Sequence, residues 1–277
     1  MELNLLTSKY LIAEEKTDGH SPMKFLCSDD QIYYCKYRVT PKKEETDFLV
    51  YEIICHYLLK HFNIPTPEIA LVELTKNSFD TRQLIRNKFY AKPGVITFGS
   101  KIITPSFLVN ETQLVDSKTD FNRFSNPSDL IKIALFDLWV GNTDRGREGN
   151  FNLLVSTVNR KSIYYAFDNA FSFFGENGLR VFNPKFTITT GDKLLNTNYF
   201  RSIVKYIPIH ERIEIVKNEL SLYDDEAFIT IVTKAFNLIP GLWNIPPGLL
   251  PRMIKFLSDR SRLKLIEQLV VSSLSTF

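Results

Sequence analysis

The first part of the chain changes from an alternating pattern of apolar and polar positions to a helical one. Residues 23–27 and 31–37 are short β-prone runs joined by the polar turn 28–30, which predicts a hairpin. In the second run Tyr34 and Lys36 share one face, because side chains alternate along a strand. Lys36 therefore stands in an aromatic strand, which is an unusual place for a solvated lysine.

A helix and a further strand are predicted to follow the hairpin. Apolar residues recur at helical spacing over residues 48–62, and either Thr46 or Asp47 can cap this helix. The Asn and Pro residues of segment 63–67 end it, and residues 69–74 predict the next strand.

The middle of the chain is predicted to hold one strong helix. Residues 75–107 are expected to be irregular, with a strand-like patch at Val95–Phe98. Asn126 is then expected to cap a helix whose first turn suits Pro127 and whose apolar face runs out at Gly141.

The remaining elements predict an α+β fold with two lobes. Two β-prone runs, 152–156 and 162–167, precede a region that is mostly helical and ends in a helix over residues 249–269. We expect a β-rich N-lobe over residues 1–105 and a mainly helical C-lobe over residues 106–277, with a cleft between them.

The composition argues against several classes of function. The 34 Lys and Arg residues against 31 Asp and Glu give a net charge of +3, which is too balanced to predict direct nucleic-acid binding. No stretch approaches the ~18 apolar residues of a membrane-spanning helix, and the N-terminus does not resemble a signal peptide. Three cysteines without Cys-x-x-Cys spacing predict buried free thiols and a cytoplasmic location.

The segment from Gly141 to Asn152 and the strand that ends at Asp168 carry the candidate chemistry. The segment links a helix to a hairpin and holds Asp144, with Asn150 six residues further on. Phosphoryl transfer needs one carboxylate at the attacking hydroxyl, and an amide oxygen with a second carboxylate for the metal ion. The order of these residues matches the layout of a protein kinase: catalytic loop, short hairpin, metal-binding Asp.

The first lobe supplies matching parts for a nucleotide. A kinase needs a Lys on a strand to hold the phosphates and a Glu on the next helix to pair with it, and Lys36 and Glu52 stand in these places. The turn Gly19–Ser21 precedes the Lys strand, and its amides and the Ser21 hydroxyl are suitable phosphate donors.

The order of these parts resembles the HipA-type serine/threonine kinases. The run Gly-Asn-Thr-Asp followed by Asn-Phe is similar to their catalytic loop, and Asn-Ile-Pro-Thr-Pro at 63–67 is similar to their helix-to-strand transition. Asp-Arg in this context also resembles the phosphoinositide-kinase superfamily. The resemblance implies one role for each residue: Asp144 as catalytic Asp, Asn150 and Asp168 as metal ligands, and Lys36 and Glu52 as the N-lobe ion pair.

The same resemblance implies the ligands and partners. They are ATP and Mg²⁺ as cofactors, a protein Ser or Thr hydroxyl as acceptor, and a toxin–antitoxin setting with an antitoxin-like regulator. Gly19 and Ser21 would lie at the nucleotide phosphates, and Ser21 is a candidate for regulatory autophosphorylation.

Departures from the family pattern leave alternatives open. The catalytic loop is one residue longer than usual before Asn150, so Asn152 is a rival metal ligand. The position after Arg145, often His in the lipid-kinase relatives, is Gly146. A lipid or small-molecule kinase, a pseudokinase that binds nucleotide without turnover, and an enzyme that transfers AMP are the other hypotheses.

Several residues near the motifs admit two interpretations. Asp137 is predicted either to shape the catalytic loop through a hydrogen bond or to be a buried capping Asp. Arg145 is predicted to pair with a carboxylate or a phosphate, or to form a purely structural salt bridge. His56 and His61 are expected at the core edge or surface, and the basic residues of 252–264 on a solvated face.

Overall fold

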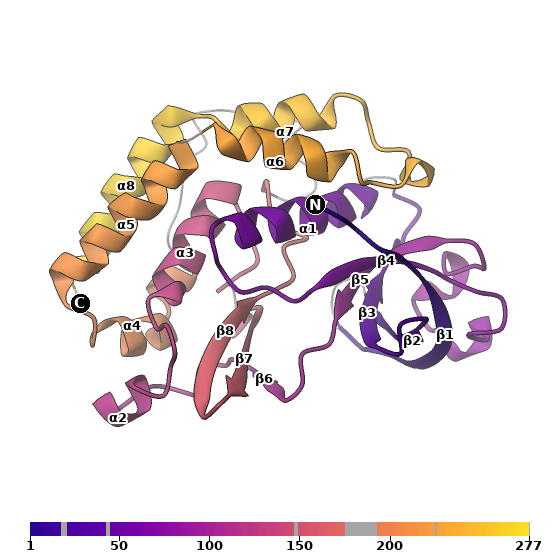
Figure 1. The fold of residues 1–277 in the computed structure, drawn as a ribbon, viewed down its shortest axis with the longest axis horizontal. Coiled ribbons are helices and arrows are strands. Elements are labelled where there is room, and N and C mark those ends of the chain that lie inside the picture. The colour runs from indigo at the N-terminus through magenta and orange to yellow at the C-terminus, as the bar shows by residue number, and fades with distance from the viewer. Residues whose placement is uncertain (18–20, 43–44, 147–148, 175–192, 225, 277) are drawn as a thin grey trace.

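The computed structural model describes residues 1–17, 21–42, 45–146, 149–174, 193–224 and 226–276. A closed β-barrel lies at one end of the molecule and a group of helices at the other (Figure 1). Helix α1 (Glu45–His61) and a second, three-stranded sheet lie between these two parts. The predicted α+β architecture with a β-rich N-terminal part and a helical C-terminal part is confirmed.

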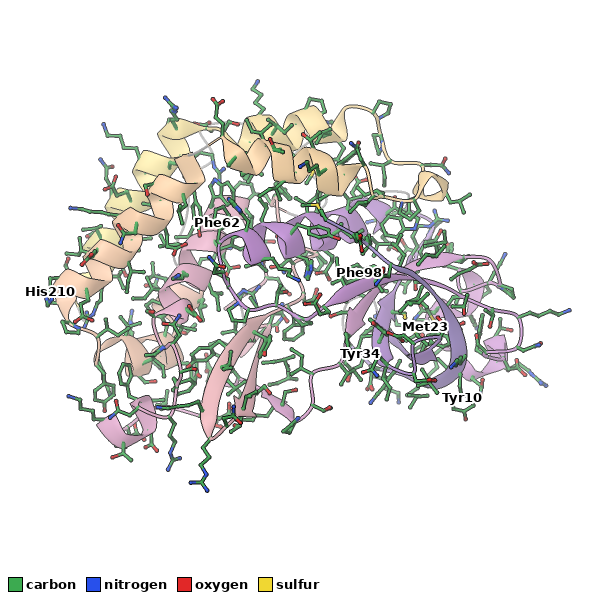
Figure 2. All side chains as sticks on the ribbon, viewed as in Figure 1. Tyr10, Met23, Tyr34, Phe62, Phe98 and His210 are labelled. Carbon is green, nitrogen blue, oxygen red and sulfur yellow. The ribbon has the colours of Figure 1, made fainter. Side chains whose placement is uncertain are left out.

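The barrel has the strand order β1-β2-β3-β5-β4, in which β1 runs parallel to β4 and all other neighbours are antiparallel. Its interior is apolar: Met23 is fully buried, whereas Tyr10 is 61% exposed on the outside (Figure 2). The predicted hairpin is β2 paired with β3. The five strands are β1 (Leu5–Glu14), β2 (Met23–Cys27), β3 (Ile32–Lys36), β4 (Ile69–Glu73) and β5 (Ile96–Lys101).

Strand β1 was not predicted, and its irregular pairing explains why. Its register with β2 shifts between Ser8 and Tyr10 and again between Leu11 and Ala13. The buried positions Ser8 and Leu11 are therefore three residues apart instead of two. A strand with such bulges does not show the strict alternation by which strands are recognised in a sequence.

Helix α1 begins at Glu45, one residue before the predicted cap. The Glu45 carboxylate accepts hydrogen bonds from the amides of Val39 and Thr40, which ties the helix start to the preceding loop. The helix is buried on nearly every face, because it packs against α6 (Ala227–Phe236) as well as against the core. Phe62 lies just past its end (Figure 2), and the centroid of its ring is 4.6 Å from that of Tyr223.

The irregular region between the two sheets holds only short elements. Two short 3-10 helices, η1 (Thr81–Gln83) and η2 (Asn87–Phe89), precede β5. The second sheet has the order β6-β7-β8, so that β6 lies at its edge. Its strands are β6 (Ser106–Leu108), β7 (Leu153–Val158) and β8 (Lys161–Ala166).

The predicted central helix is α3 (Asp129–Val140), and its predicted cap was wrong. Ser128 occupies the N-cap position, while the Asn126 side chain binds those of Ser128 and Asp129. The helix ends at Gly141, which adopts the left-handed conformation with φ 65° that glycine accepts without strain.

The long last helix that the sequence predicted is two helices. Asp259 accepts hydrogen bonds from the amides of Ser261 and Arg262, so it caps a new helix and breaks the pattern. The helical part consists of α2 (Lys118–Phe121), α4 (Asn198–Val204), α5 (Ile209–Asp224), α6, α7 (Leu249–Leu257) and α8 (Arg260–Leu274).

Two further predictions meet the structure here. The three cysteines are buried free thiols, as predicted. The basic residues of 252–264 do not all face solvent: Arg262 is 4% exposed and donates to the carbonyls of Leu138 and Trp139 at the end of α3. In the part of the chain that the structure describes, no helix is long and apolar enough to cross a membrane.

Candidate active site

A cleft of about 1000 Å³ lies between the barrel and the second sheet. Lys36, Glu52, Asp144, Asn150 and Asp168 all line it. The volume lies at the upper end of the range for small-molecule sites, roughly 300–1,000 Å³. The fold therefore brings to one cavity five side chains that the sequence had marked in separate segments.

Lys36 forms ion pairs with two carboxylates at the bottom of this cleft. It is the last residue of β3, Glu52 stands in the middle of α1, and Asp168 follows β8. The Lys36 Nζ atom lies 2.7 Å from Glu52 Oε1 and 2.7 Å from Asp168 Oδ1. Lys36 and Glu52 are only 7% and 4% exposed. We call these three residues the ion triad.

The charge of Lys36 is held by its neighbours. Burial by itself disfavours an ammonium group, but attraction to Asp168 and Glu52 outweighs it and raises the pKa of Lys36. The side chain therefore stays protonated at neutral pH and presents a cation to the cleft. Such a buried cation is suited to phosphate oxygens, whose charge it would neutralise in place of the carboxylates.

The catalytic loop after α3 forms a second group around Asp144. Its Oδ2 atom accepts hydrogen bonds from the amide nitrogens of Asn150, at 2.9 Å, and Asn152, at 2.8 Å. The backbone amide of Asp144 donates to the Asn142 side chain at 3.0 Å. We call Asp144, Asn150 and Asn152 the loop cluster.

Arg145 anchors this loop from beneath. Its side chain is fully buried, and its Nε atom lies 2.8 Å from Asp137 Oδ2 on α3. The guanidinium also donates to the carbonyls of Phe151 and Asn152. Two interpretations of Arg145 were open, and the structure supports the structural salt bridge, because the guanidinium pairs with the Asp137 carboxylate in the interior. Asp137 shapes the catalytic loop, because it also accepts from the Asn142 side chain.

Asn169 connects the two groups, and sequence reasoning gave it no role. Arg145 Nη2 donates to Asn169 Oδ1 at 3.0 Å, and the Asn169 amide donates to Glu52 Oε2 at 2.8 Å. A continuous chain of polar contacts therefore runs from Asp137 through Arg145 and Asn169 to the ion triad. Position next to Asp168 was the only signal that could have marked Asn169.

The structure explains why glycine stands at position 146, where the lipid-kinase relatives often have His. Its φ is 93°, and a Cβ atom there would lie 2.4 Å from the backbone nitrogen of Leu194. No other residue fits this close approach without moving the backbone. The chain leading into α4 therefore occupies the space that a side chain at this position would need.

The barrel side of the cleft contributes Lys16 and Thr17. Gly19 lies outside the described residues. Ser21 is 2% exposed, does not line the cleft, and donates its amide to the Thr17 hydroxyl at 3.1 Å. Its carbonyl accepts from Asn87 Nδ2 at 2.7 Å. Of the predicted site residues in the described part of the chain, Ser21 alone does not reach the cavity.

Part of the cleft lining between the barrel and the second sheet is apolar, and the sequence patterns did not mark these residues as part of a site. Tyr34 and Phe98 lie on the flank of the barrel that faces the second sheet (Figure 2), and Leu154 of β7 lines the same cleft. His56, one helical turn after Glu52, is 4% exposed, and burial lowers the pKa of its ring to about 4. It is a buried neutral residue, deeper than the core-edge position predicted for it.

Oxygen donors for a metal ion are present where the sequence predicted them. Asp168 offers a carboxylate, and Asn150 and Asn152 each use the amide nitrogen for Asp144, so neither engages its amide oxygen there. This donor set fits Mg²⁺, which prefers carboxylate and amide oxygens and keeps several waters. Both asparagines reach Asp144, so the geometry leaves them as rivals.

The two-lobed fold and this cleft place the protein among the kinase-like phosphotransferases. The family profile described as HipA-like kinase matches residues 12–219, about three quarters of the chain. The chain belongs to the HipA-like kinase family, as the sequence motifs predicted.

A solved kinase structure shares the fold at low sequence identity. The crystal structure of the Golgi casein kinase with Mn/ADP bound is 12% identical, with a TM-score of 0.52 and coverage of 99% of this chain and 74% of that chain. The crystal structure of a Helicobacter pylori proinflammatory kinase, CtkA, is 12% identical, with a TM-score of 0.49 and coverage of 98% and 97%. A comparison with curated proteins gives no match.

Proposed function

We propose that this protein is an ATP- and Mg²⁺-dependent kinase that transfers the γ-phosphoryl group to the hydroxyl of a protein Ser or Thr. The observation that carries the proposal is the position of Lys36, held between Glu52 and Asp168 in the same cleft as Asp144. A cation for the phosphates and separate carboxylates for metal and acceptor are the parts that this reaction needs.

The nucleotide would lie between the proposed N-lobe, residues 1–105, and C-lobe, residues 106–277. Lys36 would contact the α- and β-phosphates, with Glu52 fixing its position. The segment that leads from β1 to β2 would cover the phosphates from the barrel side, where Lys16 and Thr17 line the cleft. Tyr34 lines the apolar part of the cleft, where it would contact the base.

Asp168 and Asn150, or Asn152 in its place, would hold Mg²⁺. When bound there, the ion would neutralise charge on the β- and γ-phosphates. Asp144 would orient the acceptor hydroxyl and accept its proton as the oxygen attacks the γ-phosphorus in line with the leaving β-phosphate oxygen. Catalysis would come from positioning and charge neutralisation.

A cytoplasmic protein substrate and an antitoxin-like regulator complete the proposal. Ser21 remains a candidate for autophosphorylation. Its hydroxyl donates to the Thr17 carbonyl and is buried, so modification would require this turn to open.

The test is incubation of the purified protein with Mg²⁺ and γ-labelled ATP, followed by detection of label on protein. Asp144→Asn and Asp168→Asn are the controls. Loss of the proton acceptor in Asp144→Asn lowers such a rate by ~10²–10⁴-fold, and Asp168→Asn removes the carboxylate proposed for Mg²⁺. Both variants should therefore stay unlabelled, and Asp144→Asn should still bind ATP with Mg²⁺. Absence of label, ATP binding and ATP hydrolysis in the wild type would refute the proposal. ATP binding without any turnover would identify a pseudokinase. A parallel incubation with α-labelled ATP that labels the protein would identify AMP transfer, because that reaction keeps the α-phosphate and releases pyrophosphate.

A further inference from the structure

The edge strand of the second sheet is exposed at the mouth of the cleft. All three residues of β6 are exposed, with Phe107 at 49% and Leu108 at 60%. Both line the same cavity as Asp144 and Asn150. An edge strand with two large apolar side chains is a feature that proteins usually cover or blunt.

The register of β6 shows which backbone groups point outward. The amide of Val109 donates to the carbonyl of Leu153 at 3.0 Å, and Phe107 is the partner of Val155. Hydrogen-bonded and non-hydrogen-bonded pairs alternate in an antiparallel ladder, so Leu108, opposite Leu154, turns its N–H and C=O away from β7. These groups are aligned for pairing with another extended chain.

An acidic side chain follows β6 and lies next to the catalytic loop. The Glu111 carboxyl carbon is 3.9 Å from the position that a Cβ atom of Gly149 would occupy. Gly149 directly precedes Asn150, whose side chain binds Asp144. The lysines that line the cleft, Lys16, Lys36 and Lys101, all belong to the barrel side. The cleft therefore has its lysines on the barrel side, whereas Glu111 lies next to the catalytic loop, outside the lining of the cavity.

We propose that the acceptor enters as an extended protein segment that pairs with the outer edge of β6 and places a basic side chain at Glu111. This inference rests on the proposed function and specifies how the protein acceptor is held at the site. A phosphorylated headgroup or nucleotide acceptor has no backbone to pair with an edge strand, and its anionic groups would be repelled by Glu111.

The test uses a degenerate library of Ser- and Thr-centred peptides with Mg²⁺ and γ-labelled ATP. The wild type should select Lys or Arg at one position by about threefold, which is the size of a partly exposed ion pair. Glu111→Lys should select Asp or Glu at the same position. The matched control Glu214→Lys, an exposed charge reversal on α5, should keep the wild-type selection.

Backbone pairing is tested on the best peptide without changing the protein. N-methylation of one residue at a time should lower kcat/KM about three- to tenfold at alternate residues, since each methyl removes one inter-strand hydrogen bond. The inference would be overturned if the loss in kcat/KM did not alternate from one residue to the next. It would also be overturned if Glu111→Lys kept the wild-type selection for Lys or Arg.

The outcomes separate this inference from the proposed function. If the protein phosphorylates Ser or Thr peptides with Mg²⁺ and ATP but shows neither the Glu111-dependent selection nor the period of two, this inference is wrong and the proposed function stands. If it phosphorylates a lipid or small molecule but no peptide, the protein acceptor is wrong in both. If it neither binds ATP nor transfers phosphate, both are wrong.

Discussion

The ion triad and the loop cluster face the same cleft but are built in different ways. The triad joins Lys36 of β3, Glu52 of α1 and Asp168 after β8, and two of its members are almost fully buried. The loop cluster lies within nine consecutive residues, and its carboxylate is held by two neutral amides. The triad therefore depends on the packing of the whole fold, whereas the loop cluster depends on one loop and its anchor.

The difference matches the tasks that we propose for the two groups. A phosphate-binding cation must be rigid and dehydrated to act strongly, which burial between carboxylates provides. An acceptor-orienting carboxylate must stay accessible to a substrate, and Asp144 is half-buried. Arg145 and Asn169 hold the two groups in a common frame.

The largest expected effect comes from breaking this common frame. Arg145→Met leaves Asp137 as a buried carboxylate without its cation, and removal of one partner of a buried pair costs about 3–5 kcal/mol. The loss in unfolding free energy is measured by urea denaturation monitored by circular dichroism. The matched control is Arg82→Met, which removes a solvent-exposed pair with Asp80 and should leave the midpoint of urea unfolding nearly unchanged. Equal losses in the two variants would contradict the role of Arg145 as an anchor.

The next effect separates the triad from the loop cluster. Lys36→Met leaves Glu52 and Asp168 facing each other without a cation, and we expect a loss of about 2–3 kcal/mol in unfolding free energy, as for hydrogen bonds to charged groups. Asp144→Asn should change the stability by less than about 1 kcal/mol, because its surroundings are partly solvated. If Asp144→Asn unfolds as easily as Lys36→Met, the contrast between the two groups does not hold.

A smaller effect concerns pH and the helix that carries Glu52. The pKa of His56 is about 4 in the folded protein and near 6.5 when unfolded, so the unfolded state binds more protons between these values. His56 should therefore lower the stability by about 1–3 kcal/mol as pH falls from 6.5 to 4. The unfolding free energy of His56→Gln should decline less than that of the wild type between pH 6.5 and pH 4. Subtracting one pH profile from the other removes the contribution of the carboxylates, which both proteins share. Identical pH profiles would show that His56 is readily protonated in the fold.

The smallest effect distinguishes the two asparagines of the loop cluster. Replacement of the metal ligand should raise the Mg²⁺ concentration for half-maximal activity by about tenfold, the lower end for groups that support a metal site. Replacement of the other should mainly change the maximal rate through Asp144. Mg²⁺ titrations of Asn150→Ala and Asn152→Ala measure both quantities. If only Asn152→Ala raises the Mg²⁺ concentration for half-maximal activity, Asn152 is the metal ligand and Asn150 is not.

Much of the site followed from the order of residues in the chain. Lys36 and Glu52 were marked because a lysine in an aromatic strand precedes a helix with an internal Glu, and the structure places them 2.7 Å apart. Asp144 and Asn150 were marked by the loop pattern, and their side chains are in contact. Asn169, Arg262 and the apolar wall carried no comparable signal, because their roles come only from burial beside distant elements.

Errors in the predicted fold have the same origin. Strand β1 was missed because bulges place its buried residues three apart. The last helix was predicted as one, because a single capping Asp, Asp259, interrupts a pattern that otherwise continues. The helical spacing over residues 48–62 predicted helix α1 but did not indicate that nearly every face of it is buried, because packing against α6 is a tertiary contact.

The sequence by itself determined the class of protein and the types of residue in the site, because spacing along strands, helices and one loop is a local property. The tertiary structure decided that Arg145 is an interior anchor, that Ser21 is buried and does not line the cleft, and that β6 is the exposed edge strand of a sheet at the cleft that Asp144 also lines. These outcomes depend on which elements, far apart in the sequence, pack together and exclude water. A local sequence pattern does not specify such contacts.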